Sequence, residues 1–254
     1  MSDLAGLCER AARAAGVVLQ EHASSAPVGV ATKSSSTDMV SAADLAAEAR
    51  LLELLQAERP DDGILGEEGT SIAGTTGLRW VIDPLDGTTN FLYRYPQWAV
   101  SVAVEDEHGA LAGCVYDPGR DEAFVAARGE GATVNGRPIA ASAVDDLGQA
   151  LVGTGFGYLT ERRARQVAQL ATVLPEVRDI RRGGSAALDL AYTACGRLDG
   201  YYESGIQPWD WAAGVLLVRE AGGRCSVAVG PLGVEQVVAA GTGIYGRLAA
   251  LVAS

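Results

Sequence analysis

The sequence has few of the residues on which several common catalytic chemistries depend. Its two histidines, His22 and His108, lie far from the acidic motifs described below, which leaves a histidine-based triad or a phosphohistidine with little support. The four cysteines are widely spaced and form no C-x-x-C pair, so neither a thiolate zinc site nor a dense disulfide framework is indicated. We therefore expect reduced thiols and a cytoplasmic protein.

Long hydrophobic runs and an excess of positive charge are also missing. The most apolar late stretch, residues 237–254, is interrupted by three glycines and Arg247, so we expect no membrane span. The chain has 20 Lys and Arg residues against 32 Asp and Glu residues, which gives a net charge of −12 and a pI of about 4.6. A field of this sign repels nucleic acid and anionic membranes. We expect neither a membrane partner nor general binding to nucleic acid.

The composition is that of a globular protein with a sizeable core: of 254 residues, 48% are hydrophobic and 20% charged. The hydrophobic pattern predicts helices over residues 2–22 and 41–59. Short apolar runs separated by Gly, Pro and Asp predict strands at 63–65, 78–82, 98–104, 111–116 and 122–126. Asn135 and Gly136 predict a hairpin turn between the two short runs that flank them.

After residue 150 the pattern changes to an alternation of strands and helices, which is typical of a layered α/β structure. Strands are predicted at 151–153, 178–180, 198–202 and 237–239, and helices at 161–174, 185–195, 209–221 and 244–252. We place a soft boundary near residue 145, between an α+β half (1–145) and an α/β half (146–254) of one compact unit. The predicted fold class is α/β (α+β), with helices and sheets stacked in layers.

The most informative segment covers residues 80–91, with the sequence WVIDPLDGTTNF. An apolar strand ends at Asp83, a proline turns the chain, and Asp86 follows, so two carboxylates lie at the carboxyl end of a strand. Gly87 permits a close approach of the backbone before a short helix expected from Thr88. This arrangement suits a metal ion together with an anion. The spacing alone fits a solvated Asx-type turn as well.

Further acidic residues lie at strand ends and helix starts, where the sites of α/β proteins assemble. They are Asp38, Asp44, Glu67, Glu68, Glu203 and Asp210. Some have structural alternatives: Asp44 as a member of a capping box, Asp210 as a partner of the helix dipole, and Glu68 as a solvated loop charge.

Four acidic residues are candidates for a single cleft: Glu67, Asp83, Asp86 and Asp210. Four uncompensated carboxylates in one cleft are costly, which calls for bound protons, arginine partners or hard cations. Because the ligands are oxygens without His or Cys, Mg²⁺ or Mn²⁺ is favoured over zinc. Such metals would also let an acidic protein hold an anionic phosphate ester.

Five segments resemble the signature motifs of the inositol monophosphatase family and occur in the order of that family. They are 33–38 (KSSSTD), 66–68 (GEE), 80–91 (WVIDPLDGTTNF), 184–187 (GSAA) and 209–214 (WDWAAG). The first resembles the N-terminal lid motif and the fourth the substrate-loop motif. The resemblance implies a five-layer αβαβα sandwich, Mg²⁺-dependent hydrolysis of phosphomonoesters, sensitivity to lithium and a homodimer.

When the family's residue roles are carried over by motif position, the resemblance implies two to three Mg²⁺ ions per subunit, with Mn²⁺ as a possible substitute. Glu67, Asp83 and the backbone carbonyl of Leu85 would hold the first ion. Asp83, Asp86 and Asp210 would hold the second. Glu67 would also contact a more loosely bound third ion through water.

The resemblance also implies a catalytic set of Asp44, Glu67 and Thr88, in which Asp44 and Thr88 match the pair that orients the attacking water. Lys33 and Asp38 fall on the lid. The implied contacts of the phosphate and of the substrate's ring are Asp86, Gly87, Thr88, Gly184, Ser185, Ala186, Glu203 and Asp210. Gly87 and Thr88 would act through their backbone N–H groups.

The DGTTNF segment looks like the inositol branch of the family. Glu203 also fits a polyol, because a carboxylate accepts hydrogen bonds from vicinal hydroxyls. We expect hydrolysis of inositol 1-phosphate to inositol and phosphate by a metal-activated water. Alternative substrates are fructose 1,6-bisphosphate, histidinol phosphate or another sugar phosphate.

A small basic cluster precedes the substrate-loop motif and consists of Arg178, Arg181 and Arg182. Arg182 is the candidate phosphate contact of this cluster, although a dimer interface or a plain surface role fits equally well. A different class of function is that of an accessory factor for RNA polymerase or ribosomal RNA. The acidic chain, with only this short basic cluster, disfavours it.

Overall fold

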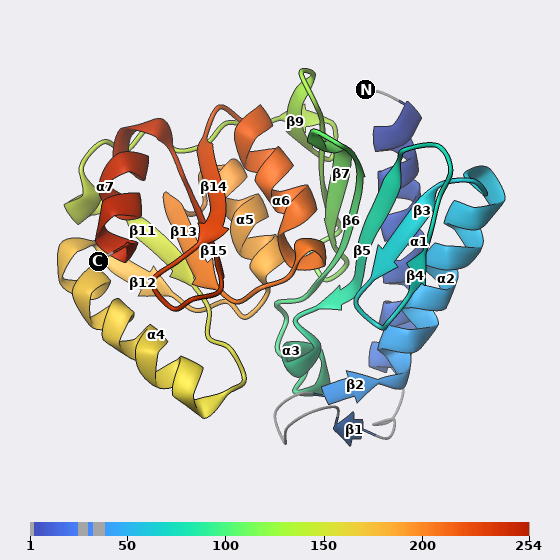
Figure 1. Ribbon diagram of the computed structural model, residues 1–254, viewed down its shortest axis with the longest axis horizontal. Coiled ribbons are helices and arrows are strands. Elements are labelled where there is room, and N and C mark those ends of the chain that lie inside the picture. The colour runs from blue at the N-terminus through green and yellow to red at the C-terminus, as the bar shows by residue number, and fades with distance from the viewer. Residues whose placement is uncertain (1–2, 25–29, 33–38, 254) are drawn as a thin grey trace.

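The computed structural model describes residues 3–24, 30–32 and 39–253 of the chain. Five layers lie side by side in Figure 1, in the order helices, sheet, helices, sheet, helices. The helical layers consist of α1 (Asp3–Ser24) with α2 (Ala42–Glu58), α5 (Ala186–Ala194) with α6 (Pro208–Glu220), and α4 (Thr160–Val173) with α7 (Thr242–Val252). The predicted αβαβα sandwich is confirmed, and all six helices lie within about two residues of their predicted bounds.

The larger sheet has eight strands in the order β10-β9-β8-β7-β6-β5-β3-β4. They are β3 (Gly63–Gly66), β4 (Ser71–Ile72), β5 (Arg79–Asp86), β6 (Ala99–Asp106), β7 (Gly109–Asp117), β8 (Glu122–Ala127), β9 (Gly131–Val134) and β10 (Arg137–Pro138). Strands β3 and β5 pair in parallel. The short β4 was not predicted. A separate antiparallel pair is formed by β1 (Val30–Thr32) and β2 (Met39–Ser41).

Strand β5 continues beyond the point at which the sequence pattern ended it. We expected the strand to stop near Ile82 and a turn to follow Asp83, and this was wrong, because β5 includes both Asp83 and Asp86. Asp83 pairs with Ser101 and Asp86 with Ala99 of β6, so β5 has one residue more than its partner between these pairs. Such a bulge offsets the alternation of side chains. It allows two aspartates three residues apart to face the same side of the sheet.

The smaller sheet has five strands in the order β12-β11-β13-β15-β14. They are β11 (Leu151–Thr154), β12 (Asp179–Arg181), β13 (Gly200–Ser204), β14 (Arg224–Val229) and β15 (Glu235–Ala240). Strand β13 was predicted two residues too early, so Glu203 lies within the strand rather than after it. Strand β14 was not predicted; it forms the edge of the sheet beside β15.

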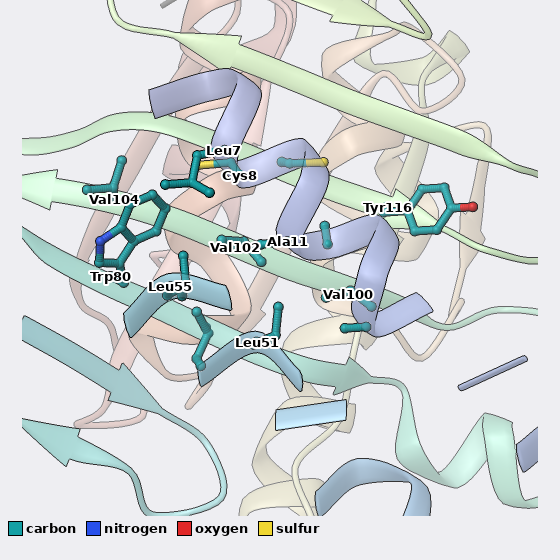
Figure 2. Close-up of a cluster of buried hydrophobic side chains, with 14 of the residues drawn as sticks. Leu7, Cys8, Ala11, Leu51, Leu55, Trp80, Val100, Val102, Val104 and Tyr116 are labelled. Carbon is teal, nitrogen blue, oxygen red and sulfur yellow. The ribbon is translucent and has the colours of Figure 1, made fainter. Parts of the chain in front are cut away.

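The core explains why the layers stack in this way. Buried side chains of α1 recur at helical spacing, as at Ala5, Cys8, Ala12 and Leu19, and this stripe packs on the larger sheet. Figure 2 shows side chains of α1 (Leu7, Cys8) and α2 (Leu51, Leu55) packed together with Trp80 and its neighbours on that sheet. A second cluster lies between the two sheets and includes most of α5 and α6. These middle helices are therefore apolar on nearly all sides.

Three smaller expectations can be compared with the structure. The hairpin at Asn135 and Gly136 is confirmed, and both residues have positive φ (47° and 75°), as a type I′ turn requires. The boundary placed near residue 145 falls between β10 and the 3₁₀ helix Leu147–Gln149, where the chain passes from one sheet to the other. The division into two halves of one compact unit stays a prediction. No described helix is long and apolar enough to cross a membrane.

Candidate active site

A cleft of about 430 Å³ lies where the ends of β5 and β13 meet the starts of α3 (Thr88–Leu92), α5 and α6. Its lining draws on motifs that are far apart in the sequence. The predicted site residues that line it are Glu67, Asp83, Asp86, Gly87, Thr88, Arg182, Gly184, Ala186, Glu203 and Asp210. The fold therefore brings most of the predicted site into one cavity.

Three aspartates form the tightest acidic group in this cleft. One carboxylate oxygen from each of Asp83, Asp86 and Asp210 lies within 4.8 Å of the other two. The first two come from the bulged end of β5, and Asp210 from the first turn of α6. Oδ2 of Asp210 also accepts a hydrogen bond from the backbone N–H of Gln207 at 2.6 Å. Asp210 thus caps its helix and joins the acidic group at the same time.

Burial and mutual repulsion both raise the free energy of these three aspartates in their ionised form. Burial raises the pKa of Asp83 well above its ordinary value, and the charges of nearby acids, Glu67 first, raise it further. Burial likewise raises the pKa of Asp210. The pKa of Asp86 is raised to about 6 by burial, although hydrogen bonds from Ser185 and from the α5 backbone oppose the shift. A cation would offset both causes, since it replaces lost hydration and neutralises the repulsion.

The hydrogen bonds that Asp83 and Asp86 accept within the protein leave carboxylate oxygen atoms that can bind such a cation. Oδ1 of Asp83 accepts the N–H of Leu85 at 2.9 Å, whereas no donor among the described residues reaches its buried Oδ2. In Asp86, Oδ2 accepts both the Ser185 hydroxyl (2.6 Å) and the Ala187 N–H (2.7 Å), which fixes the carboxylate against α5. An orphaned buried oxygen within an all-oxygen donor set fits Mg²⁺ or Mn²⁺.

Glu67 and Leu85 lie beside the three aspartates. Glu67 follows β3, the parallel neighbour of β5, and lines the same cleft without belonging to the group within 4.8 Å. Leu85 is fully buried, and its carbonyl oxygen accepts a hydrogen bond from the Thr88 hydroxyl at 3.0 Å. Their roles as metal ligands stay predictions.

Thr88 connects the acidic cleft to α2. Its hydroxyl lies between the Leu85 carbonyl and Oδ2 of Asp44, at 3.0 and 3.2 Å. Asp44 is 1% exposed and lies in the first turn of α2. Gly87, directly before Thr88, has a φ of 98°, and a Cβ there would lie 2.9 Å from the carbonyl oxygen of Gln97. Only glycine fits this close approach at the start of α3.

The predicted substrate loop forms another wall. Ser185 caps α5, because its Oγ accepts the N–H of Leu188 at 3.3 Å. Gly184, in front of it, has a φ of 89°, and Arg182 lines the cleft beside it. Arg181 instead forms an ion pair with Asp179 at 2.6 Å, and neither it nor Arg178 lines the cleft.

Glu203 lies on the wall formed by β13. Burial raises its pKa to about 7, and its Oε2 accepts a hydrogen bond from the hydroxyl of Tyr201 at 2.6 Å. The predicted lid residues, Lys33 and Asp38, lie outside the described residues.

Two residues that organise the cleft, Asn90 and Tyr201, were not predicted from the sequence. The side-chain amide of Asn90 donates to the carbonyls of Gln97 (2.6 Å) and Gly183 (3.0 Å), and so ties α3 to the loop before α5. No spacing signal reveals a contact between residues 93 positions apart. The contact between Tyr201 and Glu203 could have been inferred from the sequence, because residues two apart on a strand face the same side of the sheet.

The fold and site together define a class of protein. A layered αβαβα sandwich with an acidic cleft at its strand ends is of the sugar-phosphatase type, and its buried carboxylates are oxygen donors of the kind that hard metal ions prefer. The sequence matches the inositol monophosphatase family model over residues 2–254, and the chain belongs to that family.

Individual relatives carry two kinds of name. The chain is similar to the Nus factor SuhB of Escherichia coli K12, with 43% identity over 89% of this chain and 85% of the relative. It is also similar to the inositol-1-monophosphatase of Rhizobium meliloti, with 47% identity over 76% and 73% of the two chains. The solved structure of the extragenic suppressor protein suhB from Bartonella henselae has a TM-score of 0.92 and 38% identity, over 99% of this chain and 98% of that one. The family and the relative named inositol-1-monophosphatase indicate a phosphatase.

Proposed function

We propose that the protein is a Mg²⁺-dependent phosphomonoesterase that hydrolyses inositol 1-phosphate to inositol and phosphate. The observation that carries this proposal is the group Asp83, Asp86 and Asp210, with oxygens within 4.8 Å and one buried oxygen that no described donor reaches. Such a group is costly unless a cation binds it. The relatives named inositol-1-monophosphatase support the choice of substrate.

Two overlapping ligand sets are proposed for the metal. Glu67, Asp83 and the carbonyl of Leu85 would hold one Mg²⁺, and Asp83, Asp86 and Asp210 would hold a second. Glu67 would also contact a third, more loosely bound ion through water. When bound, Mg²⁺ lowers the pKa of its water so that a nucleophile exists at neutral pH.

The residues around the metal orient the reactants. The single hydroxyl hydrogen of Thr88 is shared between Oδ2 of Asp44 and the carbonyl of Leu85, so the lone pairs of its oxygen can accept a hydrogen bond from the attacking water. Oδ2 of Asp44 stabilises this orientation and can take up a proton through Thr88. The backbone N–H groups of Gly87 and Thr88 are proposed to bind the phosphate oxygens.

The opposite walls are proposed to bind the alcohol part of the substrate. Ser185 and Ala186 contact the ring from the start of α5, Gly184 allows the close approach of the loop, and Glu203 accepts hydrogen bonds from ring hydroxyls. Arg182 is proposed to hold a phosphate oxygen at the mouth of the cleft. By the same family resemblance we propose a lithium-sensitive homodimer in the cytoplasm.

Phosphate release from a substrate panel tests this function. The panel holds inositol 1-phosphate, fructose 1,6-bisphosphate, histidinol phosphate and phosphoadenosine phosphate, each with Mg²⁺ and with chelator. We expect chelator-sensitive release that is fastest on inositol 1-phosphate. Faster release from another ester would keep the metal site and refute the substrate, whereas no release from any ester would refute the enzyme activity.

The relatives named Nus factor favour a second candidate, an accessory role in association with RNA polymerase. The net charge of −12 opposes direct binding to RNA and leaves a protein–protein contact as the form of such a role. A pull-down with RNA polymerase from the same organism tests it. Retention of the protein by the polymerase would support the role, and its absence from the bound fraction would dismiss it.

A further inference from the structure

The carboxylate of Glu203 is held from the core side by one buried hydroxyl. Tyr201 lies two residues earlier on β13, so both side chains face the same side of the smaller sheet. Tyr201 is fully buried, and its hydroxyl donates to Oε2 of Glu203 at 2.6 Å. It is the one described side chain with a hydrogen bond to this carboxylate.

Glycines shape the space around this pair. A Cβ on Gly155, which follows β11, would overlap the carboxylate atoms of Glu203. A Cβ on Gly153 would lie 3.2 Å from the Tyr201 ring, so the ring rests directly on the β11 backbone. The Tyr201 ring has little room to turn, and Glu203 is confined between its hydroxyl and the backbone of Gly155. One carboxylate oxygen is therefore fixed toward the core while the residue still lines the cleft.

The charges near Glu203 make a neutral donor useful at this place. Asp86 repels the Glu203 carboxylate, whereas Arg182 attracts it. The charge of Asp189, on α5, also interacts with both Glu203 and Tyr201. Without the hydrogen bond from Tyr201, Coulomb attraction would draw the Glu203 carboxylate toward Arg182. A short hydrogen bond from a rigid phenol opposes that rotation without adding charge to the cleft.

We propose that Tyr201 is a positioning residue that sets selectivity for hydroxyl-bearing phosphate esters. By holding Oε2, it presents Oε1 of Glu203 to the hydroxyls of a bound polyol phosphate. This rests on the proposed function, in which Glu203 accepts hydrogen bonds from the substrate. The metal group and the phosphate contacts lie on other elements, so the reaction at phosphorus does not depend on Tyr201.

The substitution Tyr201→Phe removes only the hydroxyl, and the chain offers a matched control. Tyr202, the next residue, points to the other face of β13 and packs in the separate cluster of α7 and β15. Steady-state kinetics of both variants are measured on inositol 1-phosphate and on phenyl phosphate, which has no ring hydroxyls to read. We expect Tyr201→Phe to raise KM for inositol 1-phosphate about tenfold, the loss of roughly one positioned hydrogen bond, with kcat within a factor of two. Phenyl phosphate kinetics, and both substrates with Tyr202→Phe, stay within a factor of two.

A double-mutant comparison shows whether Tyr201 acts through Glu203. In a Glu203→Ala background, Tyr201→Phe should change KM for inositol 1-phosphate no further, because the group it positions is gone. Equal losses on both substrates, an unchanged KM, or an undiminished effect in the Glu203→Ala background would each overturn the proposal. Failure of the proposed function would appear earlier, as wild-type protein that does not prefer inositol 1-phosphate to phenyl phosphate.

Discussion

Two buried aspartates lie toward opposite ends of the neighbouring strands β3 and β5, and their surroundings differ sharply. Asp62, directly before β3, is 2% exposed, and Asp83, late in β5, is 1% exposed. Asp62 accepts hydrogen bonds from Arg59 (2.8 and 3.2 Å), from the Thr76 hydroxyl (2.6 Å) and from the indole N–H of Trp80 (3.0 Å). Both of its oxygens are satisfied by the chain.

Asp83 has one backbone donor on Oδ1 and none among the described residues on Oδ2, and its close neighbours are acids. The consequence appears in the pKa values. Hydrogen bonds from Arg59, Thr76 and Trp80 outweigh burial and lower the pKa of Asp62. Burial and like charges raise that of Asp83. Both side chains are almost completely shielded from solvent, so it is their partners that distinguish a carboxylate that stabilises the fold from one whose stabilising partner must come from outside the chain.

The largest expected effect follows from replacing Asp83 by Asn. The amide keeps the shape but removes a negative oxygen proposed to be shared by two metal ions. We expect kcat to fall on the order of 1,000-fold at saturating Mg²⁺. The metal-free variant should melt no lower than the wild type, because one source of buried repulsion is gone. Phosphate release and thermal melting in chelator measure the two effects.

Circular dichroism serves as the control for the Asp83→Asn variant, whose spectrum should match that of the wild type. Wild-type turnover at saturating Mg²⁺ would contradict the role given to Asp83. A variant that melts well below the wild type in chelator would show instead that Asp83 stabilises the fold, as Asp62 does.

The replacement of Asp62 by Asn should have the opposite profile. Asn offers one acceptor oxygen where three side chains donate, and it leaves Arg59 without its carboxylate partner. We expect a loss of about 3 kcal/mol in the free energy of unfolding. Urea denaturation measures it, with Arg10→Gln as the comparison, because the Arg10–Glu58 pair is exposed and worth little. Activity per folded molecule should be unchanged, and a drop in kcat without a drop in stability would break the contrast between the two aspartates.

The contrast between these aspartates was only half visible in the sequence. Periodicity and turn residues predicted the helices and most strands, because a buried stripe or an alternating face leaves a local pattern. The edge strands β4 and β14 were not predicted, because they are short or weakly alternating and are defined by the strands they pair with. The spacing of Asp83 and Asp86 indicated an acidic site, yet the bulge that puts them on one side depends on pairing with β6.

Contacts across long stretches of chain left still less trace. The bond from Asn90 to Gly183 and those from the start of α5 to Asp86 join segments about a hundred residues apart, and no composition or spacing rule predicts them. The donors around Asp62 are nearer in sequence, but nothing in the residues 59–80 states that three of them converge on one carboxylate. Hydrogen-bond partners are decided by packing, which is why the sequence identified the acids and could not say which were satisfied.

The smallest expected effect concerns pH and extends the contrast to the whole acidic cleft. In metal-free protein Asp86 and Glu203 have folded-state pKa values of about 6 and about 7, above the ordinary carboxyl range near 4. The folded state therefore binds protons that the unfolded state has released. The resulting stability is complete below pH 4 and is lost as pH rises through 6 and 7. The lowered pKa of Asp62 acts in the other direction, but only in more acidic solution, so comparison above pH 5 isolates the cleft.

Since Mg²⁺ is proposed to bind the deprotonated forms of Asp83, Asp86 and Asp210, its stabilising effect should grow as pH rises through the raised pKa values of these three ligands. We expect the rise in melting temperature on replacing chelator with saturating Mg²⁺ to be about 2–4 °C larger at pH 8 than at pH 5.5, the equivalent of roughly 1 kcal/mol in a protein of this size. Differential scanning fluorimetry at the two pH values measures it, with Asp83→Asn as the variant in which the Mg²⁺-induced rise should be small at both. A rise of equal size at pH 5.5 and pH 8 would mean that the cleft carboxylates are already ionised in the metal-free protein. The distinction between carboxylates stabilised by hydrogen bonds from the chain and carboxylates stabilised only by a bound cation would then not hold.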